Sequence, residues 1–316
     1  MNKAAQPSVQ YIIVQPDYSG QRIDNFLITQ LKGVPKTRIY RMLRKGEVRV
    51  NKKRVQPSYR LQDGDSMRIP PVRMDEKPKP ATPAQSLVTF LSERILYEDK
   101  YLLILNKPPG IPVHGGTGVS MGIVEALRSM FPKLPHLELA HRLDVDTSGC
   151  LILAKKRSIL KELHELFREG KVKKIYWALT KGRWKPEEYR VDVPLLKNQL
   201  SSGERIVRVN SEGKAALSFF KPLETFSNST LVEVNLMTGR THQIRVHAQY
   251  RNHQLACDEK YGDKEFNKQI RSLGLKRLFL HAKSIEFVLP TTGEHIKITS
   301  NLDTDLEECL NALRNK

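Results

Sequence analysis

His141-Arg142-Leu143-Asp144-Val145-Asp146-Thr147-Ser148-Gly149 stands between two short apolar runs, residues 137–140 and 151–154. Such runs are typical of buried strands, so the nine residues between them are predicted to form a polar loop held at both ends. A loop fixed by two strands holds a side chain with little freedom, as a catalytic group requires. Asp, Thr, Ser and Gly are also common turn formers, so this stretch by itself fits a plain turn equally well.

Positive charge dominates the chain. Its 316 residues include 53 Lys and Arg against 34 Asp and Glu, which gives a formal net charge of +19 at pH 7. An excess of this size attracts polyanions, and nucleic acid is the partner we expect, because binding by phosphate neutralisation grows with the number of basic groups engaged. An anionic membrane surface is the alternative partner.

The sequence carries no sign of a membrane or secreted protein. It has no run of about 18 apolar residues, so no spanning helix is expected. Of the two polyanions, we expect nucleic acid and no membrane as the partner. Residues 1–14 lack the charged-then-apolar layout of a signal peptide. Cys150, Cys257 and Cys309 are odd in number and far apart, which predicts neither a disulfide framework nor a zinc-ligand pair. We therefore expect a cytoplasmic protein.

Residues 18–70 have the pattern of a small, separate module. Apolar residues at helical spacing predict one helix from Ile23 to Leu31, and a second helix is predicted to open at Pro35 and stop at Gly46. Short strands follow up to Ile69, with a turn at residues 63–65.

This module carries concentrated positive charge. Residues 22–54 contain eleven Lys or Arg against two acidic residues. Arg38, Arg41 and Lys45 follow at i, i+3 and i+7, which places them on one helical face away from the apolar stripe. A solvated basic face is the ordinary explanation, and an RNA-binding face is the functional one.

A proline-rich stretch separates the module from the rest of the chain. Five prolines between residues 70 and 83 lie among charged residues, and this composition predicts an extended linker over residues 71–90. Residues 91–316 predict one α+β domain with a mixed, largely antiparallel sheet, because many strand-like runs occur with few helical ones. The predicted strands are 95–98, 102–106, 137–140, 151–154, 175–180, 217–221, 231–236, 285–289 and 296–298, and the predicted helices are 122–130, 158–168, 243–250 and 306–314.

Tyr176 lies in the second stretch of interest, Lys173-Lys174-Ile175-Tyr176, at the start of a predicted strand. A half-buried strand tyrosine is common and needs no function. The functional alternative is a flat ring that stacks on a base displaced from its helix, with a hydroxyl that can also handle a proton.

A third stretch, TGRTHQIRVH at residues 238–247, also has the composition of a site. Gly239 suits a strand-to-helix turn, and Thr241 is predicted to cap the helix that follows. His242 and His247 raise the question of a metal site. Five helical residues rotate them about 140° apart, so they share no face and we expect no metal there.

Two more stretches are predicted to be structural. Residues 106–116 combine glycines with a proline pair after a strand, which predicts a shaped loop; its amides as a phosphate cradle are the weaker alternative. Residues 277–282, RLFLHA, are predicted to be a core strand without chemistry.

Taken together, these motifs resemble a known family. His-Arg-Leu-Asp followed by Thr-Ser-Gly resembles the signature of the pseudouridine synthases that modify ribosomal large-subunit and transfer RNA. The Lys-x-Tyr at residues 174–176 and the Thr-Gly-Arg-x-His-Gln-Ile-Arg at residues 238–245 resemble further family motifs in the same order. Residues 18–70 resemble an S4 RNA-binding domain. Residues 30–36, 194–198 and 203–207 resemble one branch of the family, which acts on the large ribosomal subunit. Val145 departs from the basic residue that many relatives carry there.

The resemblance implies roles for individual residues. Asp144 is implied as the catalytic nucleophile, Arg245 as its charge partner, and Tyr176 as the ring that stacks on the flipped-out uracil. Arg142 is implied to fill the space that the base leaves. A basic helix and the strand after it are implied to grip the RNA backbone: Lys36, Arg38, Arg41, Lys45, Lys52 and Lys53.

The implied reaction converts uridines of large-subunit (23S) ribosomal RNA to pseudouridine. No atom is lost and no electron enters, so no cofactor and no metal are expected, and nothing in the sequence demands more than a monomer. A carboxylate in a cleft tends to protonate through desolvation, and a nearby guanidinium keeps it charged. Whether Asp144 adds to the base, attacks ribose C1′ or removes a ribose proton stays open.

Two other functions remain as alternatives. One is an RNA-binding or ribosome-assembly factor whose enzyme domain has lost its activity. The other is a metal-dependent hydrolase that uses His141, His242 and Asp146.

Overall fold

The computed structural model describes residues 8–31, 33–72, 83–115, 121–134, 136–185, 187, 189–199 and 205–316. The chain divides into two compact units, Met1–Ala81 and Thr82–Lys316. No helix in these described ranges is long and apolar enough to cross a membrane.

The first unit is a small sheet packed on two helices. Its elements are β1 (Gln10–Ile13), η1 (Pro16–Tyr18), α1 (Ile23–Gln30), α2 (Lys36–Lys45), β2 (Arg49–Val50) and β3 (Ser66–Ile69). The strands pair antiparallel in the order β1-β3-β2. Phe26, Ile39 and Met42 lie in its core, and Gly46 ends α2 with a positive φ of 69°. Both predicted helices are confirmed in place.

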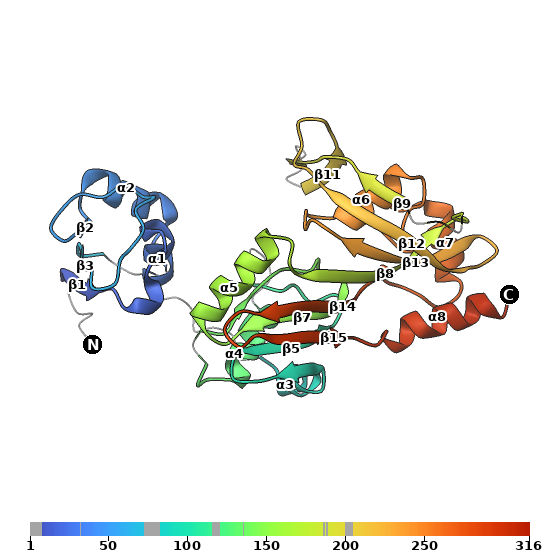
Figure 1. Ribbon diagram of the computed structural model, residues 1–316, viewed down its shortest axis with the longest axis horizontal. Helices are drawn as coiled ribbons and strands as arrows, with labels where there is room; N and C mark the ends of the chain where they lie inside the picture. Colours follow the sequence, from blue (N-terminus) through green and yellow to red (C-terminus); the bar gives the residue numbers. More distant parts are fainter. Residues whose placement is uncertain are drawn as a thin grey trace, which may run out of the picture. The chain divides into compact units, whose positions relative to one another are not determined.

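The second unit is built on a ten-stranded sheet among its described residues (Figure 1). The path is β4-β5-β7-β14-β8-β13-β12-β9, with β15 beside β14 and β6 beside β7. Only the short β14·β7 pairing is parallel among the pairs given for this sheet, which confirms the predicted α+β class. Its strands are β4 (Ile95–Glu98), β5 (Leu102–Lys107), β6 (Glu138–Leu139), β7 (Ser148–Ala154), β8 (Lys173–Lys181), β9 (Tyr189–Asp192), β12 (Leu217–Thr225), β13 (Ser229–Leu236), β14 (Leu280–Leu289) and β15 (Glu294–Thr299).

Helices and one hairpin complete this unit. The hairpin pairs β10 (Leu195–Gln199) with β11 (Arg205–Val209). The helices are α3 (Gln85–Ser92), α4 (Ile123–Met130), α5 (Arg157–Arg168), α6 (Gln243–Tyr250), α7 (Lys264–Arg271) and α8 (Thr304–Arg314). A core of buried aliphatic side chains lies between the sheet and the helices α4 and α5, with Leu103, Ile152 and Leu163 fully buried.

Several sequence expectations need correction. Helix α3 begins at Gln85, inside the stretch 71–90 that was expected to be linker throughout, because Leu91 has an apolar core to pack against; residues 73–82 lie outside the described part of the chain. The core strand expected at residues 277–282 begins only at Leu280. The strands β9, β10 and β11 and the helix α7 were not predicted from the sequence.

The parallel contact between β7 and β14 depends on a glycine. Gly149 has a φ of +105°, and a Cβ placed on it would lie 2.3 Å from the carbonyl oxygen of Ala282. Any larger residue would push the two strands apart. Ser148 and Gly149 therefore belong to β7 and not to the polar loop in which the sequence placed them.

Candidate active site

A buried lysine fixes the backbone of the loop that carries Asp144. Lys107, at the end of β5, is fully buried, and its Nζ donates to the carbonyl oxygens of Pro108 at 2.7 Å, Val145 at 2.8 Å and Thr147 at 2.9 Å. The backbone N–H of Gly110 also donates to the Val145 carbonyl at 2.9 Å. Burial lowers the pKa of Lys107 to about 7. The residues around Asp144 thus have fixed backbone positions, as a catalytic loop requires.

Asp144 and Arg245 meet across a sequence distance of 101 residues. Arg245 Nη1 lies 3.5 Å from Asp144 Oδ2, and the Asp144 side chain keeps 28% of its surface exposed. Arg245 comes from the first turn of α6, so the helix that follows the 238–242 turn brings the guanidinium to the loop. The structure therefore places the two residues together as the sequence resemblance implied.

Asp258 holds Arg245 in place, and the sequence did not single it out. Its carboxylate accepts from Arg245 Nε and Nη2, both at 2.7 Å, in a two-point ion pair, and its side chain is fully buried. Burial acts to lower the pKa of Arg245, but the hydrogen bonds and charge of Asp258 outweigh it, so this pKa lies above its ordinary value. Burial likewise acts to raise the pKa of Asp258, and Arg245 outweighs that effect and lowers it. Both groups are charged at neutral pH.

His242 completes the surroundings of the Asp144 carboxylate. His242, with a positive φ of 53°, occupies the N-cap position of α6 in place of the predicted Thr241, and its side chain makes no capping hydrogen bond. Gln243 stabilises the turn before it, because its Oε1 accepts from Thr238 Oγ1 at 2.8 Å and from the Arg240 N–H at 3.0 Å. His242 Nε2 lies 3.9 Å from Asp144 Oδ2. His247, by contrast, is fully buried and lies 3.0 Å from Ser218 Oγ.

Tyr176 lies on β8, two strands from β7 in the sheet. Its side chain is buried and belongs to the main core cluster, and its strand pairs with β13 at Val234. Burial, reinforced by the charge of Asp144, raises the pKa of Tyr176 well above its usual range. The phenol is therefore protonated at neutral pH and is a hydrogen-bond donor in that state. Its stacking role stays a prediction.

The first two residues of the His-Arg-Leu-Asp motif differ in environment. His141 accepts a hydrogen bond on Nε2 from the Ile152 N–H at 3.1 Å, and its ring centroid lies 5.0 Å from that of Phe167. Desolvation lowers the pKa of His141 to about 3, so the ring is neutral and serves the structure of the loop. Arg142 is exposed, where an RNA substrate can reach it.

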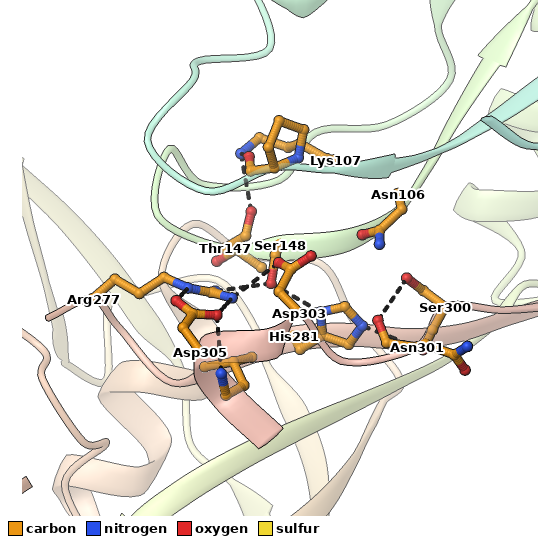
Figure 2. Close-up of polar contacts among 12 residues, drawn as sticks. Asn106, Lys107, Thr147, Ser148, Arg277, His281, Ser300, Asn301, Asp303 and Asp305 are labelled. Carbon is orange, nitrogen blue, oxygen red and sulfur yellow. Dashed lines mark hydrogen bonds and ion pairs between the residues drawn. The ribbon is translucent and has the colours of Figure 1, made fainter. Parts of the chain in front are cut away.

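A polar network surrounds Ser148, where the loop enters β7 (Figure 2). Arg277 donates to Asp305 through Nε at 2.7 Å and to Ser148 Oγ through Nη1 at 2.9 Å, and Ser148 Oγ lies 2.8 Å from His281 Nδ1. His281 Nε2 faces the Ser300 carbonyl at 3.3 Å, so it carries the proton, and Nδ1 accepts from the serine hydroxyl. This serine and histidine are fully buried and tie the start of β7 to the segment before α8; they are not an exposed nucleophile and base.

In the glycine loop after β5, the backbone amide of Gly115 has a partner within the protein. Glu125 Oε2 accepts from the backbone N–H of Gly115 at 2.9 Å and from that of Gly122 at 3.0 Å. The amide of Gly115 is thus occupied, which favours the structural interpretation over a phosphate cradle; Gly116 lies outside the described residues.

The basic residues predicted to bind RNA lie in the first unit. Arg38 is partly exposed, and its Nη2 donates to Glu47 Oε2 at 2.9 Å. The other five are exposed: Lys36, Arg41, Lys45, Lys52 and Lys53. Lys52 has a positive φ of 65° and follows Asn51. The side-chain Nδ2 of Asn51 donates to Asp65 Oδ1 at 2.8 Å, and its Oδ1 accepts from the Ser66 N–H at 2.9 Å. This turn presents the lysine side chains to solvent.

No group of three or more His, Cys, Asp or Glu that could hold a metal occurs within the described ranges. His141, His242 and Asp146 form no such group among the described residues, and Nε2 of His141 is already taken by the backbone N–H of Ile152. The geometry therefore gives no support to the hydrolase alternative.

Comparison with known proteins agrees with this geometry. A family model described as RNA pseudouridylate synthase matches residues 101–250, and the S4 domain model matches residues 21–66. The chain belongs to the RNA pseudouridine synthases, a family of isomerases. It is 54% identical over 316 residues to ribosomal large subunit pseudouridine synthase C of Escherichia coli (strain K12), and 53% identical over 317 residues to the protein of that name in Salmonella typhi, with 99% of each chain covered. The solved human RNA pseudouridylate synthase domain containing 4 matches with a TM-score of 0.60 and 30% identity over 72% of this chain and 96% of that one.

Proposed function

We propose that this pseudouridine synthase acts on uridines of large-subunit ribosomal RNA, with Asp144 as its nucleophile. The observation that carries the site assignment is the Asp144 carboxylate, partly exposed on a clamped loop and 3.5 Å from a guanidinium that Asp258 holds rigidly. The observation that supports the substrate is the likeness, over 99% of the chain, to relatives named for the ribosomal large subunit.

The reaction exchanges one bond of the nucleotide for another. The bond from ribose C1′ to uracil N1 breaks, a bond from C1′ to C5 forms, and the proton on C5 is replaced by one on N1. Because the uracil must leave its stack first, flipping costs about a few kcal/mol, which RNA binding has to supply. In this proposal Arg142 fills the vacated space.

Asp144 meets the ribose–uracil junction in its ionised form. Arg245 stabilises that charge, since a guanidinium within a few ångströms favours the carboxylate over the acid. Tyr176 lies beneath the base and keeps its proton, so it stacks and donates and does not act as a base in the resting enzyme. The three routes open to Asp144, namely addition to the base, attack on C1′ and removal of a ribose proton, all begin from this arrangement.

The function test uses unmodified large-subunit ribosomal RNA and the purified full-length protein. Pseudouridine is detected by carbodiimide labelling and primer extension, and the same map is made for RNA from a strain that lacks the gene. We expect new pseudouridines at specific positions in vitro and their loss in the deletion strain. An unchanged map together with intact RNA binding would instead favour the assembly-factor alternative.

The first unit contributes RNA affinity in this proposal. Replacing Arg41 and Lys45 by Gln is expected to weaken RNA binding and to lower the slope of log K against log[salt] by about 0.7–0.9 for each phosphate that the variant no longer neutralises. The matched control is Lys264→Gln with Lys268→Gln, another exposed i, i+4 pair of basic residues, on α7. Equal losses of affinity in both double variants would contradict a specific role for the S4 unit.

We take the enzyme to be a monomer, because Asp144, Arg245, Asp258 and Tyr176 all come from one chain. We place it in the cytoplasm, where its ribosomal substrate is.

A further inference from the structure

His242 lies beside the proposed nucleophile, and the reaction scheme gives it no task. Its φ of 53° turns the chain sharply at the start of α6 and directs the ring to the Asp144 loop. Its Nε2 lies 3.9 Å from Asp144 Oδ2, and its side chain keeps only 16% of its surface exposed. The ring is therefore part of the wall of the site.

A hydrogen-bond relay determines which ring nitrogen of His242 carries the proton. The hydroxyl of Tyr261 accepts from the backbone N–H of Val207 at 2.9 Å and lies 2.8 Å from His242 Nδ1. The Val207 N–H takes one acceptor site of this oxygen, and among the described contacts of the hydroxyl only Nδ1 can accept the hydroxyl's own proton. Nδ1 is then the acceptor, and the proton of a neutral imidazole is on Nε2, the nitrogen that faces the carboxylate.

The charges around the ring agree with a neutral, donating His242. Burial lowers the pKa of His242, and the charges of Arg245 and Lys260 lower it further, while those of Asp144 and Asp258 act in the opposite direction. An anionic acceptor opposite Nε2 also favours the tautomer with the proton there.

Both donors face the same oxygen of Asp144. Arg245 Nη1 lies 3.5 Å from Oδ2, and His242 Nε2 lies 3.9 Å from that oxygen, whereas none of the side-chain contacts of Asp144 within the described residues involves Oδ1. These distances exceed those of good hydrogen bonds, and such contacts in a free enzyme shorten when the substrate closes the site.

We propose that His242 is a positioning residue of the isomerisation: its Nε2–H, presented by the Tyr261 hydroxyl, joins Arg245 in holding Oδ2 of Asp144, and Oδ1 is delivered to the substrate. This inference rests on Asp144 as the nucleophile of the proposed function. It extends the site to the hairpin strand β11, because the relay starts at the backbone of Val207.

His242→Asn is the most informative variant. Asn adopts positive φ more readily than most residues, so the start of α6 is preserved, but its side chain is too short to reach Asp144. We expect kcat to fall roughly tenfold, as for the loss of a hydrogen bond to a charged group, with RNA affinity and the melting temperature unchanged. His242→Gln, whose amide reaches farther, is expected to recover part of kcat. The matched control is His295→Asn, which changes an exposed histidine on β15 and is expected to keep full activity.

Tyr261→Phe tests the relay separately from the helix cap. If the two residues act in one chain, the double variant Tyr261→Phe/His242→Asn loses no more kcat than His242→Asn does alone. Nitrogen NMR of the wild-type ring is expected to show a protonated Nε2 and an unprotonated Nδ1, and Tyr261→Phe is expected to disturb that pattern.

Full kcat in His242→Asn, additive losses in the double variant, or a protonated Nδ1 in the wild type would each overturn the inference. Asp144→Asn, measured in parallel, separates the two proposals. If Asp144→Asn is inactive and His242→Asn is normal, only the role of His242 fails; if Asp144→Asn is active, the nucleophile assignment fails first.

Discussion

Asp144→Asn is expected to abolish pseudouridine formation while RNA binding persists. The substitution keeps the size of the side chain and removes its charge and its nucleophilic oxygen. Arg245 stays in place, because Asp258 binds it at two points, so the site does not collapse. We expect the single-turnover rate to fall on the order of 10³-fold or more, with an unchanged dissociation constant for RNA.

A neighbouring carboxylate supplies the control for this experiment. Asp146 lies two residues away on the same loop and is exposed. Asp146→Asn changes the net charge by the same amount and is expected to keep most of the activity. Normal turnover in Asp144→Asn, or equal losses in both variants, would show that the reaction does not depend on the carboxylate that faces Arg245.

Of the variants proposed for this protein, Asp258→Ala is expected to lower the free energy of unfolding the most. The side chain of Asp258 is fully buried and that of Arg245 is 8% exposed, so the variant leaves a buried guanidinium with only the more distant Asp144. Removal of one partner of a buried ion pair costs about 3–5 kcal/mol of unfolding free energy. The backbone N–H groups of Lys260 and Tyr261, which donate to Asp258 Oδ1 at 2.9 Å, lose their acceptor as well.

Urea unfolding measures the loss of stability, and kcat measures how well Arg245 is still positioned. Asp258→Asn keeps an acceptor for the two backbone N–H groups, so we expect it to be more stable than Asp258→Ala and still slower than the wild type, because Arg245 is held less firmly. The exposed pair of Arg190 and Asp192 provides the comparison, and Asp192→Ala is expected to leave stability nearly unchanged. If Asp258→Ala were as stable as the wild type, then solvation by water or pairing with Asp144 would be enough to stabilise the charge of Arg245 without Asp258.

Local patterns in the sequence predict the positions of those helices and strands that have a strong apolar period. The helices α2 and α5 and the strands β5 and β8 are found where apolar spacing predicted them. Helix α7 has only a weak apolar pattern, because it buries only Phe266, Asn267 and Ile270 and is otherwise charged or polar. Its start depends on Asp263, which accepts from the Phe266 N–H at 2.8 Å, a signal of one residue. The hairpin β10–β11 was missed because it has few buried side chains in the described part of the chain.

Candidate site residues divide in the same way. Asp144, Tyr176 and Arg245 stand in dense, unusual stretches, so the sequence singles them out. Asp258 and Tyr261 lie in a stretch without a recognisable motif, and their roles follow only from their contacts with Arg245 and His242 in the folded chain. The sequence pattern around His242 suggests only a metal ligand, since helical spacing relates this residue to His247 and not to a loop far away in the chain.

The sequence by itself determined the two-unit plan, the α+β class, the charge that attracts RNA and the loop with its aspartate, because each follows from composition or from spacing between neighbours. The tertiary structure decided which groups surround that aspartate. Arg245 reaches it across 101 residues, Asp258 holds Arg245 in turn, and the Tyr261 hydroxyl orients His242 from a third segment. Contacts of this kind depend on how strands and helices pack, and a buried charge selects its partner only once that packing has excluded water.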